Sequence, residues 1–260
     1  MDVLVVGGTG EAGRATVVAL VERGHTVRVL SRSGTTDVPG ATGYRGDLTT
    51  GAGLHEAMAG VEAVVDTFNV TTQSYDVARK AFVGSTERLL AAEVEAGVKH
   101  HVLLSIVAID GSSFPYYRAK VDQEQAVVAG PVPYTILRAT QFHEFAGQLA
   151  TQTKFGPFVV VPTIVTRPVA VSEVGEVLAD VVEAPPAERA PDLFGPAVQK
   201  MPDMVRRTLQ ARGVRALVIP VPLPGKVGEM MRSGRMGGNG VGRRSHETFD
   251  EWVQGEPRRA

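Results

Sequence analysis

The chain has 260 residues, of which 43% are hydrophobic and 21% are charged, and its formal net charge is −1. The lack of cysteine excludes disulfides, thiolate metal sites and a cysteine nucleophile, and the near-neutral charge gives no overall reason to expect nucleic acid or a membrane as partner. No apolar run reaches the ~18 residues of a transmembrane helix and no secretory signal pattern is visible, so the expected location is cytoplasmic.

The first 140 residues alternate short β-branched runs with longer helical patterns. Strands are predicted at residues 3–6, 26–30, 42–45, 61–66, 98–104 and 133–137, and helices at residues 11–23, 51–59, 75–96 and 115–129. Strands separated by helices imply right-handed crossovers and a parallel sheet covered on both faces. We therefore expect residues 1–140 to form an α/β, Rossmann-type doubly wound parallel sheet.

The pattern is less regular beyond residue 140. The predicted elements are strands at residues 158–161 and 164–169, a helix at 173–183 with Ser172 as its N-cap, a linker at 184–191, a helix between Pro202 and Gly213, a loop at 234–242 and a short helix carrying Trp252. We expect residues 141–260 to form a smaller substrate-binding lobe with sheet-extending segments, and not an independent domain.

A glycine-rich turn joins the first strand to the first helix. A P-loop is excluded there, because Arg14 and Ala15 occupy the positions of the phosphate lysine and the magnesium-binding hydroxyl. The glycine spacing instead fits a dinucleotide site, where the backbone approaches a pyrophosphate at a helix N-terminus. The predicted cofactor-binding residues of the turn are Gly7, Thr9, Gly10, Glu11, Ala12 and Gly13. The alternative is a structural turn that is merely rich in glycine.

The end of the second strand favours NADP(H) over NAD(H). An NAD site usually places a carboxylate there, whereas this chain has Ser31-Arg32-Ser33 and no carboxylate before Asp37. Arg32 can bind a 2′-phosphate through two hydrogen bonds, and either serine can add another. After the third strand, Asp47 and its neighbour Leu48 are expected to contact the adenine.

Tyr116 and Lys120 are four residues apart at the start of a predicted helix, and therefore on one helical face. An ammonium beside a phenol favours the phenolate, so we expect the tyrosine pKa to be lowered toward that of a useful acid or base. The alternative is an exposed pair on a surface helix.

These motifs together resemble the short-chain dehydrogenase/reductase superfamily. The resemblance is carried by Gly7-x-x-Gly10-x-x-Gly13, Gly46-Asp47-Leu48 and Tyr116-x-x-x-Lys120. Residues 102–110, 116–120, 134–143, 169–175 and 193–196 look like its atypical, NmrA-like branch, so the similarity covers essentially the whole chain. That branch includes NADPH-dependent reductases of quinones and aromatic compounds as well as redox-sensing regulators.

The resemblance implies roles for further residues. Tyr116 would transfer the carbonyl proton, Lys120 would hold the nicotinamide ribose, and Ser105, eleven residues before Tyr116, would polarise the carbonyl. By position, the residues expected along the cofactor are Thr67, Phe68 and Asn69, and those expected beside the nicotinamide are Thr140, Gln141 and Phe142. His143 is a candidate substrate contact, although lone histidines are more often structural.

No metal site is predicted. Residues 200–245 carry ten Lys/Arg against Asp203 and Glu229, a local excess of +8. This stretch lacks aromatic residues, so we interpret it as a basic edge attracting an anionic cofactor or substrate, and expect no nucleic-acid partner.

The sequence thus predicts an NADP(H)-dependent oxidoreductase acting on a small carbonyl, quinone or conjugated alkene, as a monomer or homodimer. Two alternatives stay open: a non-catalytic NADP(H)-sensing regulator or scaffold, and a redox-neutral isomerase or cyclase on the same fold.

Overall fold

The computed structural model describes residues 1–255; the last five residues of the predicted lobe lie outside the described part. Two compact units are present: residues 1–105, 109–138 and 174–190 form the first, and residues 106–108, 139–173 and the chain from 191 onward form the second. None of the helices in residues 1–255 combines the length and apolarity needed to cross a bilayer.

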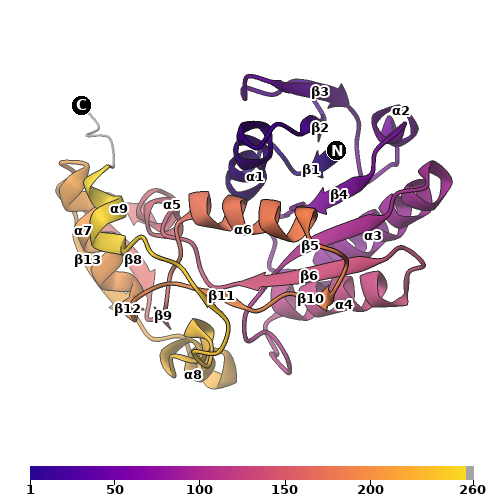
Figure 1. Cartoon of the computed structure of the whole chain (residues 1–260). Helices are drawn as coiled ribbons and strands as arrows, with labels where there is room; N and C mark the ends of the chain where they lie inside the picture. Colours follow the sequence, from indigo (N-terminus) through magenta and orange to yellow (C-terminus); the bar gives the residue numbers. More distant parts are fainter. Residues whose placement is uncertain (256–260) are drawn as a thin grey trace. The chain divides into compact units, whose positions relative to one another are not determined.

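The first unit is built on a parallel sheet in the order β3-β2-β1-β4-β5-β6, as predicted (Figure 1). Its strands are β1 (Asp2–Val6), β2 (Thr26–Ser31), β3 (Ala41–Arg45), β4 (Ala63–Asp66), β5 (His100–Ile106) and β6 (Tyr134–Ala139), and β10 (Glu188–Arg189) pairs with β6. Its helices are α1 (Glu11–Glu22), α2 (Leu54–Met58), α3 (Tyr75–Ala96), α4 (Pro115–Ala129) and most of α6 (Val171–Glu183). β1 and β4 are completely buried except for Asp2, which explains their continuous apolar runs.

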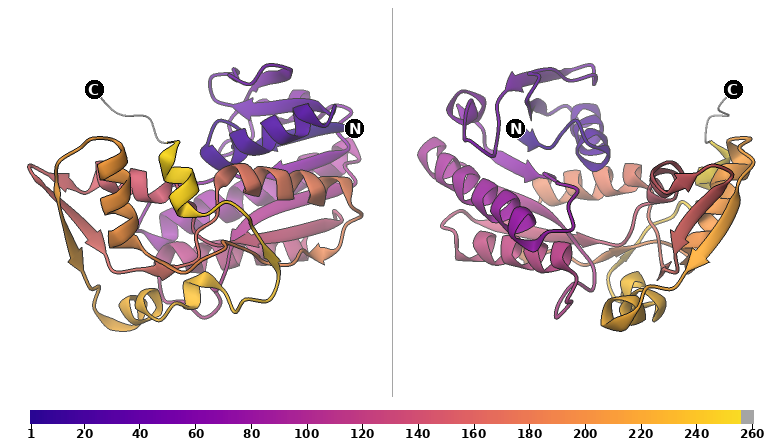
Figure 2. Two further views of the ribbon diagram at one scale, coloured as in Figure 1. Left: turned by 60° about the vertical axis from the view of Figure 1, so that its left-hand side comes forward. Right: turned by 180° about the vertical axis from the view of Figure 1, so that it is seen from behind.

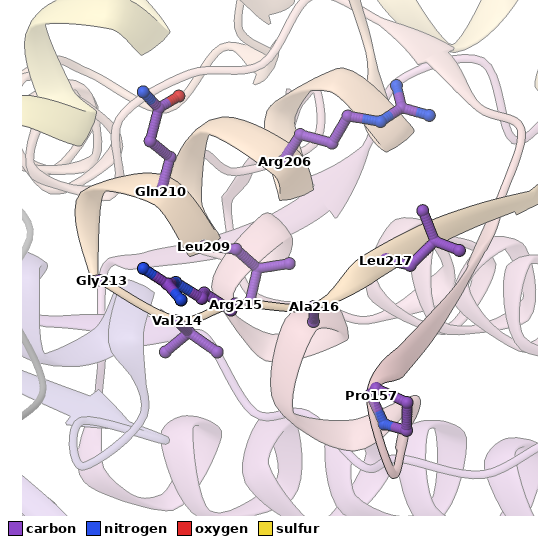
Figure 3. Close-up of a pocket in the computed structure, with 9 residues that line it drawn as sticks. All are labelled: Pro157, Arg206, Leu209, Gln210, Gly213, Val214, Arg215, Ala216 and Leu217. Carbon is purple, nitrogen blue, oxygen red and sulfur yellow. The ribbon is translucent and has the colours of Figure 1, made fainter.

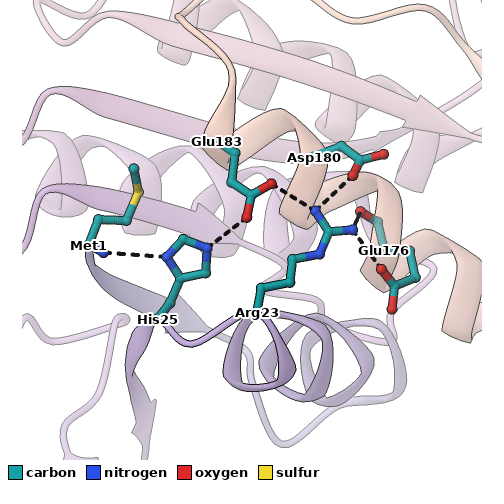
Figure 4. A network of polar contacts seen from close by, with 6 residues as sticks. All are labelled: Met1, Arg23, His25, Glu176, Asp180 and Glu183. Atoms are coloured by element: carbon teal, nitrogen blue, oxygen red, sulfur yellow. Dashed lines mark hydrogen bonds and ion pairs between the residues drawn. The ribbon is translucent and has the colours of Figure 1, made fainter.

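A polar network explains why residues 174–190 belong to the first unit. Arg23, at the end of α1, donates hydrogen bonds to the carboxylates of Glu176 (2.6 Å), Asp180 (2.7 Å) and Glu183 (3.0 Å), all on α6 (Figure 4). His25 adds a 2.9 Å contact to Glu183. The predicted domain division at residue 140 stays a prediction. Most of α6 lies beyond that residue in the sequence but belongs to the first unit.

The second unit contains three small strand pairings. β7 (Lys154–Phe155), β8 (Phe158–Pro162) and β13 (Leu217–Val221) form one sheet, β9 (Val165–Thr166) pairs with β12 (Gln199–Lys200), and β11 (Leu193–Phe194) pairs with β14 (Arg243–Arg244). The helices are α5 (Phe145–Gln152), α7 (Met201–Ala211), α8 (Gly225–Arg232) and α9 (Phe249–Gln254), with a 3₁₀ turn at Arg235–Gly237.

Several predicted boundaries in the second half of the chain are wrong. The strand expected at 164–169 is only Val165–Thr166, the 184–191 linker contains β10, and the 234–242 loop contains a 3₁₀ turn. Ser172 is not an N-cap, because α6 already begins at Val171, whose N–H donates to the carboxylate of Glu144 (3.4 Å). The carboxylate of Glu144, distant in sequence, therefore accepts a backbone N–H at the start of α6, which is the role expected of Ser172.

Candidate functional site

The strand order of the first unit reverses between β1 and β4, because β1 has β2 on one side and β4 on the other. In open parallel sheets, ligands bind beyond the carboxyl ends of the strands at such a reversal. The glycine-rich turn follows β1, and residues 67–69 follow β4. The topology therefore brings two of the predicted cofactor segments together.

Steric exclusion fixes the shape of the glycine-rich turn. Gly7 has φ +76°, and a Cβ on Gly13 would lie 2.2 Å from the Gly7 carbonyl oxygen. The Gly10 N–H donates to that same oxygen (2.9 Å), and the Thr67 hydroxyl donates to the carbonyl of Val6 (2.8 Å). Side chains at Gly7 or Gly13 would force these close backbone contacts apart.

The turn presents the N-terminus of α1 to solvent. Gly10 is the N-cap and provides no capping side chain, and Thr9, Gly10 and Glu11 are exposed, whereas Ala12 and Gly13 are buried under the first turn. An uncapped helix N-terminus with exposed backbone is suited to an anion. These residues therefore fit a dinucleotide pyrophosphate.

The loop after β2 leaves one cation available. Ser31 is buried; its hydroxyl donates to the carbonyl of Thr35 (3.0 Å) and accepts from Gly34 N–H (3.1 Å). Ser33 lies within hydrogen-bond distance of Ser31 (3.2 Å), so both serines shape the loop. The guanidinium of Arg32 is exposed and has no hydrogen-bond or ion-pair partner among residues 1–255.

The nearest carboxylate of this loop is already engaged. Asp37 forms a 2.8 Å ion pair with Arg14 on α1, which lowers the pKa of Asp37. Asp47 accepts hydrogen bonds from the backbone N–H (2.8 Å) and hydroxyl (2.6 Å) of Thr49, which lower its pKa. Leu48, expected to contact adenine, places its side chain in the core, so only its backbone could do so.

The Tyr116 hydroxyl lies at the carboxyl end of the sheet, where it donates a 2.7 Å hydrogen bond to the side-chain oxygen of Asn69. Its ring packs edge-on against Phe82, which also contacts Phe68. Tyr116 and Asn69, which were predicted as site residues from different segments, are thus in direct contact. Burial raises the pKa of Tyr116 to about 12, so the expected lowering by Lys120 is wrong.

The direction taken by Lys120 explains that correction. Its ammonium is buried and donates to the carbonyl of Leu104 (3.0 Å) and the side-chain oxygen of Gln123 (2.7 Å). The same ammonium lies 5.1 Å from the centre of the Phe82 ring. Burial lowers the pKa of Lys120 to about 8, and Asp66 acts in the opposite sense.

Sequence analysis missed Asp66 and Gln123. Gln123 donates to the Asp66 carboxylate (3.1 Å) and to the Thr86 hydroxyl (3.1 Å), and Asp66 also accepts from Phe68 N–H (2.9 Å). A buried carboxylate at the end of an apolar strand, and a glutamine three residues after Lys120, were the available signals. Through these hydrogen bonds, Gln123 orients Lys120, and Asp66 orients the first residues after β4.

Ser105 lies inside β5, with its side chain buried. Its hydroxyl has no hydrogen-bond partner among residues 1–255. A buried hydroxyl without a partner normally costs free energy, which is consistent with a polar group of a ligand as partner. Its assignment to substrate stays a prediction.

The remaining predicted residues lie in the second unit. The Thr140 hydroxyl donates to the carbonyl of Arg167 (2.5 Å), and Gln141 and Phe142 are partly exposed, with Phe142 bridging to Val169. Their expected place beside the nicotinamide stays a prediction.

His143 lies in the core of this unit. It is fully buried, its ring packs at 5.4 Å from Phe249 and 5.7 Å from Trp252, and its Nε2 lies 3.2 Å from the carbonyl of Glu247. Burial also lowers its pKa. Its Nδ1 has no hydrogen-bond partner among residues 1–255, and the expected substrate contact stays a prediction.

Comparisons with known proteins agree on a nucleotide-binding family. A family model described as NAD(P)H-binding matches residues 7–185. A (4-alkanoyl-5-oxo-2,5-dihydrofuran-3-yl)methyl phosphate reductase from Streptomyces griseus is 35% identical over 152 residues, covering 54% of this chain and 48% of the relative. The photosystem II assembly factor Ycf39 of Trieres chinensis is 28% identical over 149 residues, covering 55% and 47%. The chain thus spans about half the length of the curated relatives it matches.

Solved structures share the fold at low identity. A short-chain dehydrogenase/reductase superfamily protein from Agrobacterium tumefaciens, with bound NAD, aligns with a TM-score of 0.71 at 19% identity, covering 98% of this chain and 95% of that one. A UDP-glucose 4-epimerase from Bifidobacterium longum aligns with a TM-score of 0.75 at 15% identity, covering 98% and 97%.

Proposed function

This chain belongs to the NAD(P)H-binding family of atypical short-chain dehydrogenases/reductases, and from that premise we propose that it is an NADP(H)-dependent reductase of a small carbonyl, quinone or conjugated alkene. The observation that carries this proposal is the Tyr116 hydroxyl, held at the carboxyl end of the sheet by Asn69. The glycine-rich turn opens at the same end of that sheet, after β1.

The residues present fit a phosphorylated dinucleotide. The exposed N-terminus of α1 would hold the pyrophosphate, and Arg32 would bind a 2′-phosphate, since its exposed guanidinium makes no hydrogen bond or ion pair within residues 1–255. Asp37, the nearest carboxylate after β2, is committed to Arg14 and does not compete for a ribose hydroxyl. When bound, the nicotinamide of this cofactor supplies the hydride.

Tyr116 would supply the proton that balances the hydride. In carbonyl reduction the carbon gains the hydride, and the oxygen gains the phenolic proton of Tyr116, which water then replaces. Because burial raises the pKa of Tyr116 to about 12, the phenol stays protonated at neutral pH. A protonated phenol can serve as the acid that a reduction requires.

The proposal is tested by following NADPH oxidation with a panel of quinones, ketones and enones. Tyr116→Phe should lower kcat by about 10²–10⁴-fold while the affinity for NADPH is retained. Tyr134→Phe is the matched control: Tyr134 is the first residue of β6 and packs against Leu103, Val127 and Ile136, so loss of its hydroxyl should leave kcat within about twofold. If NADPH binds and no member of the panel is turned over, the proposal is wrong.

A second candidate is an NADP(H)-sensing protein that binds a partner without chemistry. The resemblance to Ycf39, named as an assembly factor, favours it. It predicts a partner affinity that differs between NADP⁺ and NADPH and does not change in Tyr116→Phe.

A further inference from the structure

The sheet formed by β7, β8 and β13 has an unexpected outer face. Val159, Val161 and Val218 point inward and are buried, while Figures 1 and 2 show α7 alongside this sheet. A sheet with one buried face normally alternates apolar and polar residues. Here the outward positions are apolar too: Phe155, Phe158, Val160, Leu217, Ile219 and Val221, which we call the apolar face.

The register makes this face continuous. Leu217 lies opposite Phe158, Ile219 lies opposite Val160, and Phe155 lies opposite Phe158 on the other side. Phe155 is 80% exposed and Leu217 61% exposed. Contiguous apolar patches of this kind are rare on monomeric proteins unless they bind something.

The surroundings of the apolar face are cationic. The two stretches that build the sheet, residues 151–169 and 212–228, contain five Lys/Arg and no Asp or Glu. Arg215, two residues before Leu217, is exposed and has no ion-pair partner among residues 1–255. Lys154 is also exposed, but it lies opposite the buried Val159 and therefore extends from the other side of β7. The local +8 excess of residues 200–245 therefore includes charge beside an apolar surface.

An open hollow of about 730 Å³ adjoins this face, with Pro157 and Leu217 in its lining. Figure 3 shows Arg206 and Gln210 extending from α7, and Arg215 in the loop that leads to Leu217. Arg206 is paired with Asp203 (2.5 Å), so Arg215 is the cation left available here. An anionic group would find an unpaired guanidinium at the margin of the apolar face.

We propose that the apolar face, with Arg215 at its margin, docks the protein peripherally onto an anionic lipid surface. The apolar side chains would enter the interfacial region, and the guanidinium of Arg215 would meet a lipid phosphate. Phe155 precedes the Gly156-Pro157 turn of a hairpin, and a membrane accepts such a projecting ring without a matching pocket. This departs from the expectation of no membrane partner, which rested on the near-neutral net charge of the whole chain.

Two other occupants fit less well. A second copy would bring the unpaired cations of two identical margins together, and like charges at an interface are unfavourable. Addition of a partner strand to β13 is opposed by Pro220, which has no N–H to donate.

The test is co-sedimentation of the full chain with vesicles of equal parts phosphatidylglycerol and phosphatidylcholine, and with phosphatidylcholine alone. Binding to the anionic vesicles alone, weakened by salt, is expected. Arg215→Glu should weaken binding at least about fivefold, and Phe155→Ser about tenfold. The matched controls Lys80→Glu and Val94→Ser, exposed sites on α3, should leave binding unchanged.

Circular dichroism and thermal unfolding of each variant establish that it is folded. No sedimentation with either vesicle would overturn the proposal. So would a wild-type dimer in light scattering that becomes monomeric in Leu217→Lys, because a second copy would then cover the face. These measurements need no substrate, so their failure is separate from failure of the proposed reductase activity.

Discussion

The glycine-rich turn and the Tyr116–Lys120 pair lie in the same unit but are determined differently. In the turn, absent side chains fix the structure: Gly7 and Gly13 allow backbone contacts that any Cβ would prevent. In the pair, partners from other segments fix the side chains, since Asn69 holds the tyrosine and the carbonyl of Leu104 holds the lysine. The local structure of a glycine motif is therefore easier to predict from sequence than that of a motif of titratable groups, because glycine acts through the absence of its own side chain.

The largest expected effect tests the turn. Gly13→Ala, in the first turn of α1, places a Cβ 2.2 Å from the backbone oxygen of Gly7 and should cost about 3 kcal/mol of unfolding free energy, with loss of NADPH binding. Gly84→Ala is the control: it also lies inside a helix, α3, but its Cβ meets only the end of the Arg88 side chain at 3.2 Å. It should stabilise the protein by about 0.5–1 kcal/mol in urea unfolding. Equal effects of the two substitutions would contradict steric control of the turn.

A second prediction concerns the buried lysine. Lys120 has a pKa of about 8 in the folded protein and 10.5 as its ordinary value, so between these limits the unfolded chain binds the extra proton. Stability should then rise from pH 8 to about pH 10, by roughly 1.4 kcal/mol per unit and about 2–3 kcal/mol in all. Above that range, ionisation of tyrosine in the unfolded chain opposes the rise, because burial keeps Tyr116 protonated.

Urea unfolding across this pH range measures the effect. Lys120→Met should remove the rise, whereas Lys80→Met, at an exposed position on α3, should retain it. An unchanged slope in Lys120→Met would assign the pH dependence to other groups.

The smallest expected effect distinguishes two arginines near the turn. Arg32→Ala should weaken NADPH binding about tenfold, or ~1.4 kcal/mol, and leave NADH binding unchanged, because only NADPH carries the 2′-phosphate. Arg14→Ala should change either affinity less than about threefold, since its guanidinium is engaged by Asp37. Titration calorimetry gives both values, and equal losses for the two cofactors in Arg32→Ala would reject the phosphate contact.

Prediction from sequence succeeded for the sheet and failed where burial decides a role. The apolar runs of β1 and β4 placed the central strands correctly, because parallel strands buried on both faces leave a clear local pattern. The expectation that Lys120 lowers the pKa of Tyr116 was wrong, since Leu104 and Gln123 hold the ammonium and burial raises that pKa. The short strands of the second unit, such as β9, carry too few residues to show a period.

The sequence by itself determined the parallel α/β architecture and the glycine turn, because strand burial and backbone sterics act over a few neighbouring residues. Only the tertiary structure decided that Lys120 points to Leu104 and Gln123 and leaves the pKa of Tyr116 high. The apolar outer face of β8 and β13 was likewise invisible before the two strands were paired. Burial, exposure and proton affinity depend on which distant segments meet, and that information is spread over the whole chain.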